Sequence, residues 1–216
     1  YDNMYLTFDD STFNNIVIAA RKTGEVIYGM DDDENITADL AKIPDDTAHA
    51  IGEQVATIFT VNSTNNGVSH TVDGDGNGGI TVGAGKIFNL SNTNFKNFTT
   101  AIINNNETNL TNVTLEDNTT ADISNTGTVN LYGTDVVKTV TGAGIMNIGS
   151  ATTTADVTFT QGGLISQNVL TIASGSNLAT YANSLNITSG VSNEGTIQLL
   201  GGALGSAING TNGVVN

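Results

Sequence analysis

The residues best placed for chemistry lie in a glycine-rich segment near residue 75. Asp73, Asp75 and Asn77 alternate with glycines. This is the Asp-x-Asp-x-Asn-Gly spacing of a calcium loop, in which oxygens at alternate positions surround a hard cation. The twelfth position of such a loop supplies a bidentate Glu, and here it is Ala84. Two interpretations stay open: calcium bound by Asp73, Asp75 and Asn77, or, favoured by the missing Glu, a glycine-rich turn that enters the first full coil.

The other acidic and histidine residues give weaker signals for a site. Residues 31–34 are all acidic and could collect a divalent cation, but a run of like charge is usually a solvated loop. The carboxylates of a glycosidase must lie about 5 to 9 Å apart, and the Asp pairs at 9–10 and 45–46 both fall in the first 60 residues. His49 and His70 are far apart and belong to no Ser-His-Asp phrase. We therefore expect no enzymatic activity and no cofactor other than the candidate calcium.

The charge balance excludes several classes of partner. The chain has a formal net charge of −15 with six Lys and Arg in total, and none follows Lys138. Nucleic-acid binding depends on clustered basic residues that displace counterions from phosphates, so nucleic acid, anionic membranes and heparin-like chains are not expected partners. The absence of Cys excludes disulfides and thiolate metal sites. No apolar run approaches about 18 residues, so no membrane-spanning helix is expected in this segment.

Composition and short repeats indicate many strands joined by tight turns. Only 12% of the residues are charged, one is Pro and 25 are Gly, while Val, Ile and Thr favour strands and Asn and Gly favour turns. From about residue 68 a polar residue followed by Leu or Ile recurs, first at steps of 20, 21 and 17 residues. Later steps are irregular, which leaves open that one of the pairs is a second strand of the same coil. The aligned pairs are Asn89-Leu90, Asn109-Leu110, Asn130-Leu131, Asn147-Ile148, Thr171-Ile172, Asn186-Ile187 and Gln198-Leu199.

Two longer phrases recur in the same order. Residues 123–131 (ISNTGTVNL) match residues 191–199 (VSNEGTIQL) at an offset of 68, and residues 140–147 match residues 208–216 at 68 to 69. Three coils of about 20 to 23 residues each would account for this offset.

Such a repeat predicts stacked coils. One coil cannot bury its own apolar face, whereas stacked coils bury a continuous strip and pair their backbones about 4.8 Å apart. Asn and Gly are expected at corners, where φ > 0 is often required, and Asn side chains are expected to ladder their amides from coil to coil. The residues expected to point inward are Val129, Leu131, Ile145, Ile148, Leu170, Ile172, Leu185, Ile187, Ile197 and Leu199.

Several phrases resemble a known family. Residues 59–62 (FTVN), 72–82 (VDGDGNGGITV) and 86–98 (KIFNLSNTNFKNF) are similar to the N-terminal part of an autotransporter-type passenger or a related β-helical bacterial adhesin. In that family an (I/V)DGNG phrase opens the helix and an F-x-(I/L)-x-N-x-x-F phrase forms the next coil. The resemblance covers roughly residues 58–216 and implies an extracellular parallel β-helix. The family's C-terminal barrel is not part of this sequence.

The amino-acid composition of the chain changes near residue 60. Residues 1–60 carry most of the charged clusters and two helical patterns, at 12–22 and 47–58, which predicts an N-terminal cap or assembly region. Residues 61–216 are predicted to be solenoid repeats. Because Asn216 aligns with Asn147, which is followed by the rest of a strand, we expect the solenoid to be truncated at its C-terminal end.

These observations combine into one prediction. The fold class is all-β, a parallel β-solenoid (β-helix) of right-handed sense with a mixed N-terminal capping region. The expected function is that of an extracellular structural or adhesive rod or filament subunit on a bacterial surface. Its partners would be further copies of itself, head-to-tail or lateral, or cell-surface glycans of a host or neighbour. The alternative is a polysaccharide-binding or -cleaving β-helix of tailspike type, which needs a carboxylate pair and stacked Tyr or Phe on one exposed face.

Overall fold

The computed structural model describes residues 3–8, 36–37, 58–63, 70–74, 76, 78–181, 185–201, 208–210 and 212–216. Every regular element within these ranges is a β-strand, and none is a helix. Accordingly, no helix that could cross a bilayer occurs in this part of the chain. The expected helix at 12–22 lies outside the described residues. So does the helix expected at 47–58, apart from Ile58, which begins a strand.

The strands form three parallel sheets. Sheet A contains, in spatial order, β2 (Ile36–Thr37), β1 (Asn3–Phe8), β3 (Ile58–Ser63), β6 (Ile87–Ser91), β9 (Glu107–Thr111), β12 (Thr128–Leu131), β15 (Ile145–Ile148), β18 (Val169–Ile172), β21 (Val191–Asn193) and β23 (Ile208–Asn209). Sheet B contains β5 (Ile80–Val82), β8 (Thr100–Asn104), β11 (Ala121–Asn125), β14 (Val140–Thr141), β17 (Ile165–Gln167) and β20 (Leu185–Ile187). Sheet C contains β4 (His70–Asp73), β7 (Thr93–Lys96), β10 (Thr114–Glu116), β13 (Thr134–Val137), β16 (Asp156–Phe159), β19 (Asn177–Tyr181), β22 (Thr196–Gly201) and β24 (Val214–Val215).

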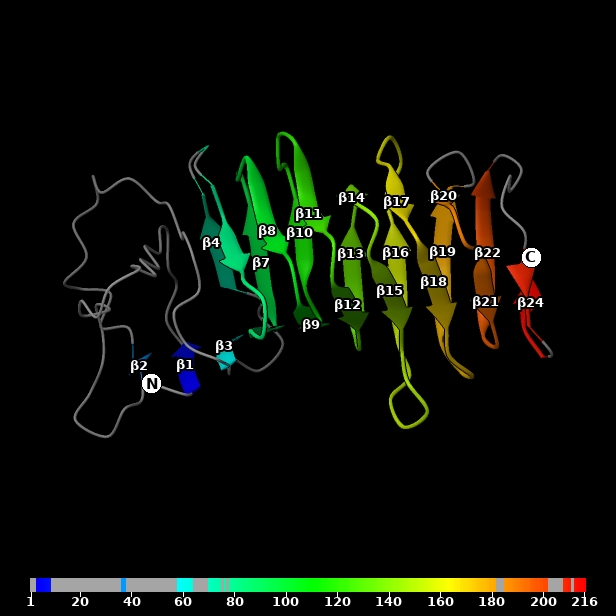
Figure 1. Cartoon of the computed structure of the whole chain (residues 1–216), viewed down its shortest axis with the longest axis horizontal. Helices are drawn as coiled ribbons and strands as arrows, with labels where there is room; N and C mark the ends of the chain where they lie inside the picture. Colours follow the sequence, from blue (N-terminus) through cyan, green and yellow to red (C-terminus); the bar gives the residue numbers. More distant parts are fainter. Residues whose placement is uncertain are drawn as a thin grey trace.

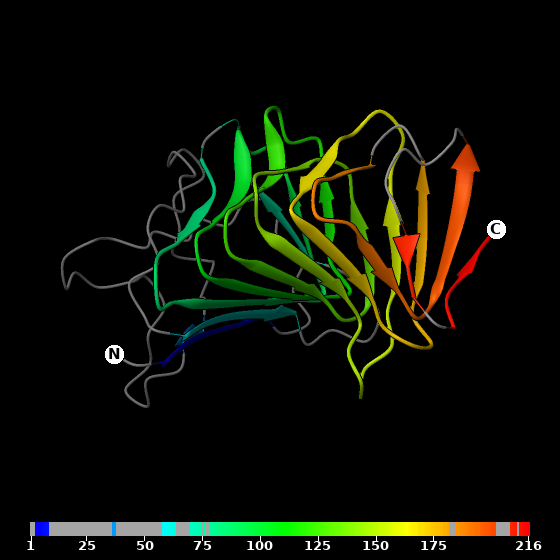
Figure 2. The ribbon, with the colours of Figure 1, turned by 45° about the vertical axis from the view of Figure 1, so that its right-hand side comes forward.

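The chain visits sheets A, C and B in turn, and then begins the next coil. Six coils, which start at β3, β6, β9, β12, β15 and β18, supply a strand to all three sheets. Successive coils lie side by side along the long axis (Figure 1), and the three faces of each coil can be followed in Figure 2. The predicted all-β parallel β-solenoid is therefore confirmed.

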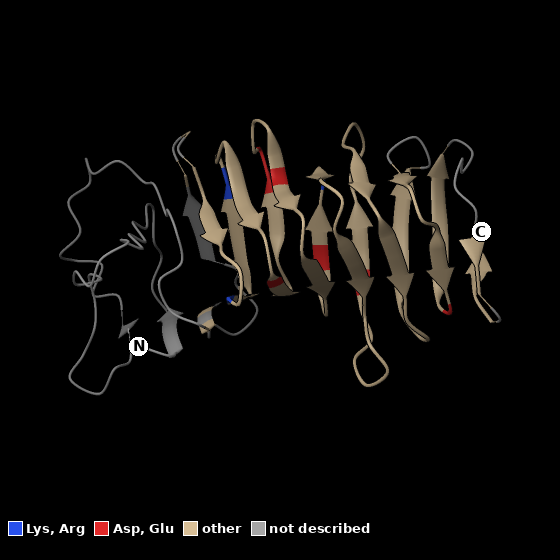
Figure 3. Ribbon diagram, in the orientation of Figure 1, with Lys and Arg blue, Asp and Glu red and all other residues tan. Residues whose placement is uncertain are grey.

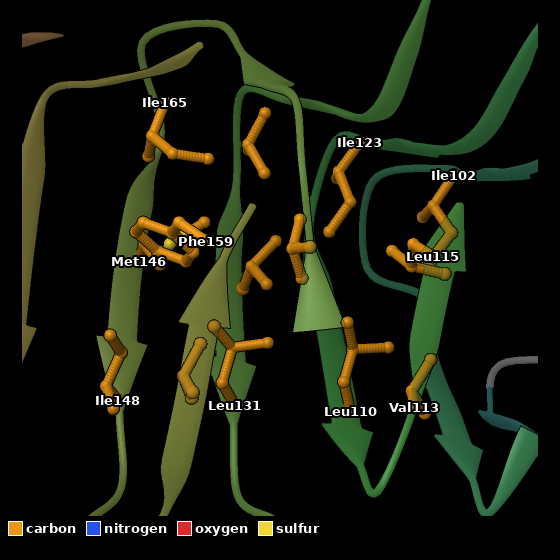
Figure 4. Close-up of a cluster of buried hydrophobic side chains, with 14 of the residues drawn as sticks. Ile102, Leu110, Val113, Leu115, Ile123, Leu131, Met146, Ile148, Phe159 and Ile165 are labelled. Atoms are coloured by element: carbon orange, nitrogen blue, oxygen red, sulfur yellow. The ribbon is translucent and has the colours of Figure 1, made fainter. Parts of the chain in front are cut away.

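The core fills the space between the three sheets. Within each strand alternate side chains point inward, as in β6, where Phe88 and Leu90 are fully buried between partly exposed neighbours. Figure 4 shows such side chains converging from all three sheets. Phe95 lies 5.3 Å from Phe98 and 6.4 Å from Phe88, centroid to centroid. Burial of one Leu, Ile or Phe contributes about 1.5 to 3 kcal/mol to the stability of the fold. Stacked coils bury such side chains against one another, whereas the apolar face of a single coil would stay in contact with water.

The predicted inward residues are nearly all correct. Eight are buried, and Leu199 is partly buried and packs against the core. Ile145 is wrong, because it is 40% exposed. It pairs with Thr128 on the outer face, while Met146 pairs with Val129 and fills the inward position. A hydrophobic residue at a strand start does not reveal which face it occupies, and a one-residue shift reverses the face.

The short repeat is confirmed over its first five members. Asn89, Asn109, Asn130, Asn147 and Thr171 are direct partners along sheet A. The last two members leave this column, and the alternative left open is confirmed for one of them, because Asn186 in β20 lies in the same coil as Thr171 in β18. Asn186 pairs with Ser166 in sheet B, and Gln198 pairs with Ala179 in sheet C. The sheet A column continues instead through Ser192 and Asn209.

The 68-residue offset is not a whole number of coils, which corrects that prediction. Val191 lies three coils beyond Val129, through Met146 and Leu170. The phrase at 123–131 joins sheet B to sheet A, whereas its match at 191–199 joins sheet A to sheet C. The repeated phrase therefore marks a corner between two strands and not a fixed place in the coil. Its second copy lies at the next corner around the coil.

Candidate functional site

The glycine-rich segment packs directly on the coil that follows it. The N–H groups of Gly74 and Gly79 donate to the carbonyls of Lys96 and Thr100, each at 2.9 Å. A Cβ on Gly74 would lie 2.2 Å from the Phe98 ring, and one on Gly79 would lie 1.9 Å from a backbone oxygen of the next coil. Glycine is required at both positions by this close approach.

The candidate calcium ligands are only partly covered by the structure. Asp73 ends β4, while Asp75 and Asn77 lie outside the described residues, as do residues 31–34. Calcium binding at Asp73, Asp75 and Asn77 therefore stays a prediction. Within the described ranges, no three His, Cys, Asp or Glu side chains gather in a way that could hold a metal ion.

An amide ladder runs along the outer face of sheet A. Asn109 Nδ2 donates to Asn89 Oδ1 at 2.9 Å, Asn130 Nδ2 to Asn109 Oδ1 at 2.8 Å, and Asn147 Nδ2 to Asn130 Oδ1 at 2.9 Å. Asn89 Nδ2 extends the series to Thr60 Oγ1 at 3.1 Å. These side chains alternate with inward residues, so they face outward. We call this series the outer ladder, and it confirms the predicted laddering of asparagine amides.

The outer face of sheet A is nearly free of charge. From β6 to β21 its strands contain a single charged residue, Glu107, although the chain carries −15 overall. The described strands of sheet C hold Lys96, Glu116 and Asp156 at partly or fully exposed positions, besides Asp73 and the buried Asp135, and those of sheet B hold only the buried Asp122. Figure 3 shows how sparse charged residues are along the coils. Beside the outer ladder runs a second outward column, which consists of Ile87, Glu107, Thr128, Ile145 and Val169.

A second ladder is buried at the corner between sheets B and A. Asn104 and Asn125 are fully buried. Asn104 Nδ2 donates to Asn125 Oδ1 at 2.8 Å and to the carbonyl of Thr128 at 2.9 Å. Asn125 Nδ2 donates to the carbonyl of Ile145 at 3.1 Å, and Asn125 Oδ1 accepts the N–H of Gly127 at 3.1 Å. We call this series the inner ladder.

One coil of the inner ladder has no side chain, and a longer residue spans the gap. The ladder position of that coil is Gly142, whose Cβ would lie 2.1 Å from the Asn125 carbonyl oxygen. Asn125 Nδ2 donates at 2.6 Å to Gln167 Oε1, which lies 42 residues further along the chain. Gln167 Nε2 donates in turn to the Gly142 carbonyl at 3.3 Å. The extra methylene of Gln lets one amide reach across two coils.

The same corner recurs between sheets A and C. Asn193 is buried, its Oδ1 accepts the N–H of Gly195 at 3.1 Å, and its Nδ2 donates to the Val214 carbonyl at 3.1 Å. Asn193 pairs with Ile172 and so takes a place that holds Leu or Ile in earlier coils. The shared phrase Ser-Asn-x-Gly-Thr is therefore the sequence signature of an inward asparagine that pins two coils together.

Two buried carboxylates are held by backbone N–H groups. Asp135 is fully buried in β13, where Oδ1 accepts the N–H of Val113 at 2.8 Å and Oδ2 accepts that of Gly133 at 3.1 Å. Burial raises the pKa of the Asp135 carboxyl above its usual range, while the N–H groups of Val113, Gly133 and Tyr132 limit the rise. The carboxylate joins one coil to the next, and no cation among the described residues pairs with it.

Asp122 performs the same task in sheet B. Its Oδ2 accepts the N–H groups of Lys138 and Thr139 at 2.6 and 3.0 Å, and its Oδ1 accepts Asn118 Nδ2 at 2.8 Å. Asn118 Oδ1 accepts the N–H of Phe98 at 2.9 Å, so the series links three coils. Burial raises the pKa of Asp122, opposed by these hydrogen bonds and by the charge of Lys138.

Sequence reasoning missed the inner ladder and both buried carboxylates. The Ser-Asn-x-Gly-Thr phrase was a usable signal, since it occurs at residues 124–128 and 192–196. Asn was expected at the corners, and nothing in the spacing indicated that its side chain would point inward. For Asp122 and Asp135 no signal was available, because each is one polar residue within an ordinary strand pattern.

Comparison of the chain with protein-family models, with curated proteins and with solved structures returned no match to any of the three. The fold is accordingly established by the strand pairings, and the function has to be argued from the surface.

Proposed function

We propose that this chain is the shaft of an extracellular structural or adhesive rod on a bacterial surface and that it acts by contact and not by catalysis. The observation that carries the proposal is the outer face of sheet A. Its polar column continues in register from Thr60 to Asn209. Such a surface repeats the same chemistry at every coil, about 4.8 Å apart. A repetitive surface suits multivalent contact, in which weak individual bonds add up.

The buried polar groups of the described coils support a structural role. Each oxygen of Asp122 and of Asp135 accepts at least one hydrogen bond from this chain. The two carboxylates lie on different sheets, in β11 and β13. A glycosidase needs two carboxyl groups that face one substrate, and these two hold coils together instead.

The alternative is a β-helix that binds or cleaves neutral polysaccharide, and it draws less support. It requires exposed aromatic rings beside a carboxylate pair. Tyr132 follows β12 of sheet A and Tyr181 ends β19 of sheet C, so these two rings do not share a face. The phenylalanines with described side chains are all fully buried, namely Phe88, Phe95, Phe98 and Phe159.

Negative-stain electron microscopy of the purified chain, followed by glycan and cell-binding arrays, tests the proposal. We expect rods that associate with one another or bind cell surfaces without altering them. Release of shortened saccharides from a bound polysaccharide would overturn the proposal in favour of the alternative. Rods that neither associate nor bind any cell or glycan would overturn both.

A further inference from the structure

The chemistry of the outer ladder is self-complementary. An asparagine amide presents two N–H donors and an oxygen with two lone pairs. Within the ladder Asn130 and Asn147 each use one Nδ2–H, and no described residue donates a hydrogen bond to Asn147 Oδ1. Asn130 and Asn147 therefore keep one N–H for an identical rung placed opposite, whereas Asn109 donates its second N–H to Glu107 Oε1 at 3.0 Å and can only accept. Charged columns lack this property, since identical charges repel.

The repeat distance points to the same partner. The amides of the outer ladder are spaced by the coil stacking itself, because Asn89, Asn109, Asn130 and Asn147 are direct strand partners. A second rod has the same spacing, so matched rungs stay in register along the whole shared length. Paired sheets whose identical amides stack and interdigitate are the arrangement of steric zippers.

The second outward column, beside the outer ladder, exposes apolar side chains at positions where charged residues would also fit. Ile145 is 40% exposed, and Ile87 and Val169 are partly exposed on the same face. An exposed β-branched residue on a sheet face packs readily against another such face. Because Glu107 is the one charged residue on the sheet A strands from β6 to β21, two of these faces meet with little repulsion despite the net charge of −15.

We propose that the outer face of sheet A, from β6 to β21, docks against the same face of a second copy of this chain. This inference rests on the proposed role as a contact rod, to which it adds the partner and the contact face. The six strands contain 25 residues, and they cover about 400 Å² per copy at about 3.3 Å per residue and about 4.8 Å between strands. That area lies below the roughly 800 Å² per partner of a stable complex. Single pairs therefore bind weakly, and arrays of longer rods bind through many such contacts.

Sedimentation velocity from micromolar to millimolar concentration tests the inference. The variant Thr128→Glu with Ile145→Glu places two new charges at paired positions on the outer face of sheet A. Its matched control is Ser124→Glu with Thr141→Glu, which does the same at paired, partly exposed positions on sheet B. Equal melting temperatures of the two variants show that each is folded to the same extent.

The wild-type sedimentation coefficient should rise with concentration, and the sheet A variant should need at least tenfold more protein for the same rise. The control should behave like the wild type. Added salt should strengthen wild-type association, because it screens the repulsion between acidic rods. The docking face is overturned if both variants associate equally, if salt dissociates the complex, or if the wild type stays monomeric at millimolar concentration in high salt. If both variants associate equally, or if a monomeric wild type binds cells, the proposed function as a contact rod is retained. Only the assignment of the docking face to sheet A is then rejected.

Discussion

The two asparagine ladders use one functional group in opposite environments. In the outer ladder each amide bonds mainly to a side chain of the adjacent coil, and three of them, Asn89, Asn109 and Asn147, are partly exposed, while Asn130 is 8% exposed. In the inner ladder Asn125 is fully buried, and it uses both N–H groups and both lone pairs within the chain. An exposed amide can exchange a lost partner for water, whereas a buried one cannot. The inner ladder therefore holds the coils together, and the outer ladder is available for contact.

The sharpest test of this comparison removes one amide from each ladder. Asn125→Ala deprives Asn104, Gly127, Ile145 and Gln167 of a buried partner, and it should lower the free energy of unfolding by about 3 kcal/mol or more. Asn109→Ala removes the same atoms from the surface and should cost about 1 kcal/mol or less. Urea denaturation followed by circular dichroism measures both. Equal losses would show that burial does not separate the two ladders.

The second prediction concerns Gly142, the position at which the inner ladder has no side chain. Gly142→Ala places a Cβ 2.1 Å from the Asn125 carbonyl oxygen at a φ of 114°, so we expect a loss of about 3 kcal/mol, similar to removal of the ladder amide. Gly162→Ala is the control, since its φ is 81° and no atom lies within 4 Å of the added Cβ. The control should lose only about 1 to 2 kcal/mol, from backbone strain. Thermal unfolding of the two variants decides, and a smaller loss at Gly142 would contradict the close approach.

Much of the fold could be predicted from sequence, because each coil must place an apolar residue at every second position. The column through Asn89, Asn109 and Asn130 followed from spacing alone. The 68-residue offset was misleading, because a corner phrase recurs wherever a strand pair needs that corner, and the solenoid has three corners per coil. Face assignment failed at Ile145, where Ile and Met are adjacent and either could point inward. The inner ladder was missed because spacing shows neither burial nor direction.

Carboxylates, like amides, should respond differently to substitution in buried and in exposed positions. Burial raises the pKa of Asp135 above its usual 3.8, so the folded state binds this proton more tightly than the unfolded state does. The stability that this group adds is full below the usual Asp pKa, and it is lost as the pH rises through the raised pKa. Stability should therefore fall as the pH rises above the usual pKa of Asp, and Asp135→Asn should flatten that fall.

The control for Asp135→Asn is Asp156→Asn, which removes the same charge from an exposed position on the neighbouring strand. Urea midpoints measured across the pH range should show the flatter profile for the Asp135 variant alone. If both variants change the profile equally, the pH dependence comes from the net charge of the rod and not from the buried carboxylate.

The smallest effect concerns a hydroxyl directly behind the outer ladder. Thr108 is fully buried in β9, and its Oγ1 has no hydrogen-bond partner, which costs stability. Thr108→Val keeps the shape and removes the unpaired oxygen, so we expect a gain of about 1 kcal/mol in the free energy of unfolding. Thr93→Val is the matched control, because Thr93 is equally buried but its Oγ1 donates to the Ser91 carbonyl at 2.7 Å. Thr93→Val should lower the free energy of unfolding, because it removes this hydrogen bond. Urea denaturation of the two variants measures both changes. Changes of opposite sign would show that a buried hydroxyl is tolerated in this solenoid only where it has a hydrogen-bond partner.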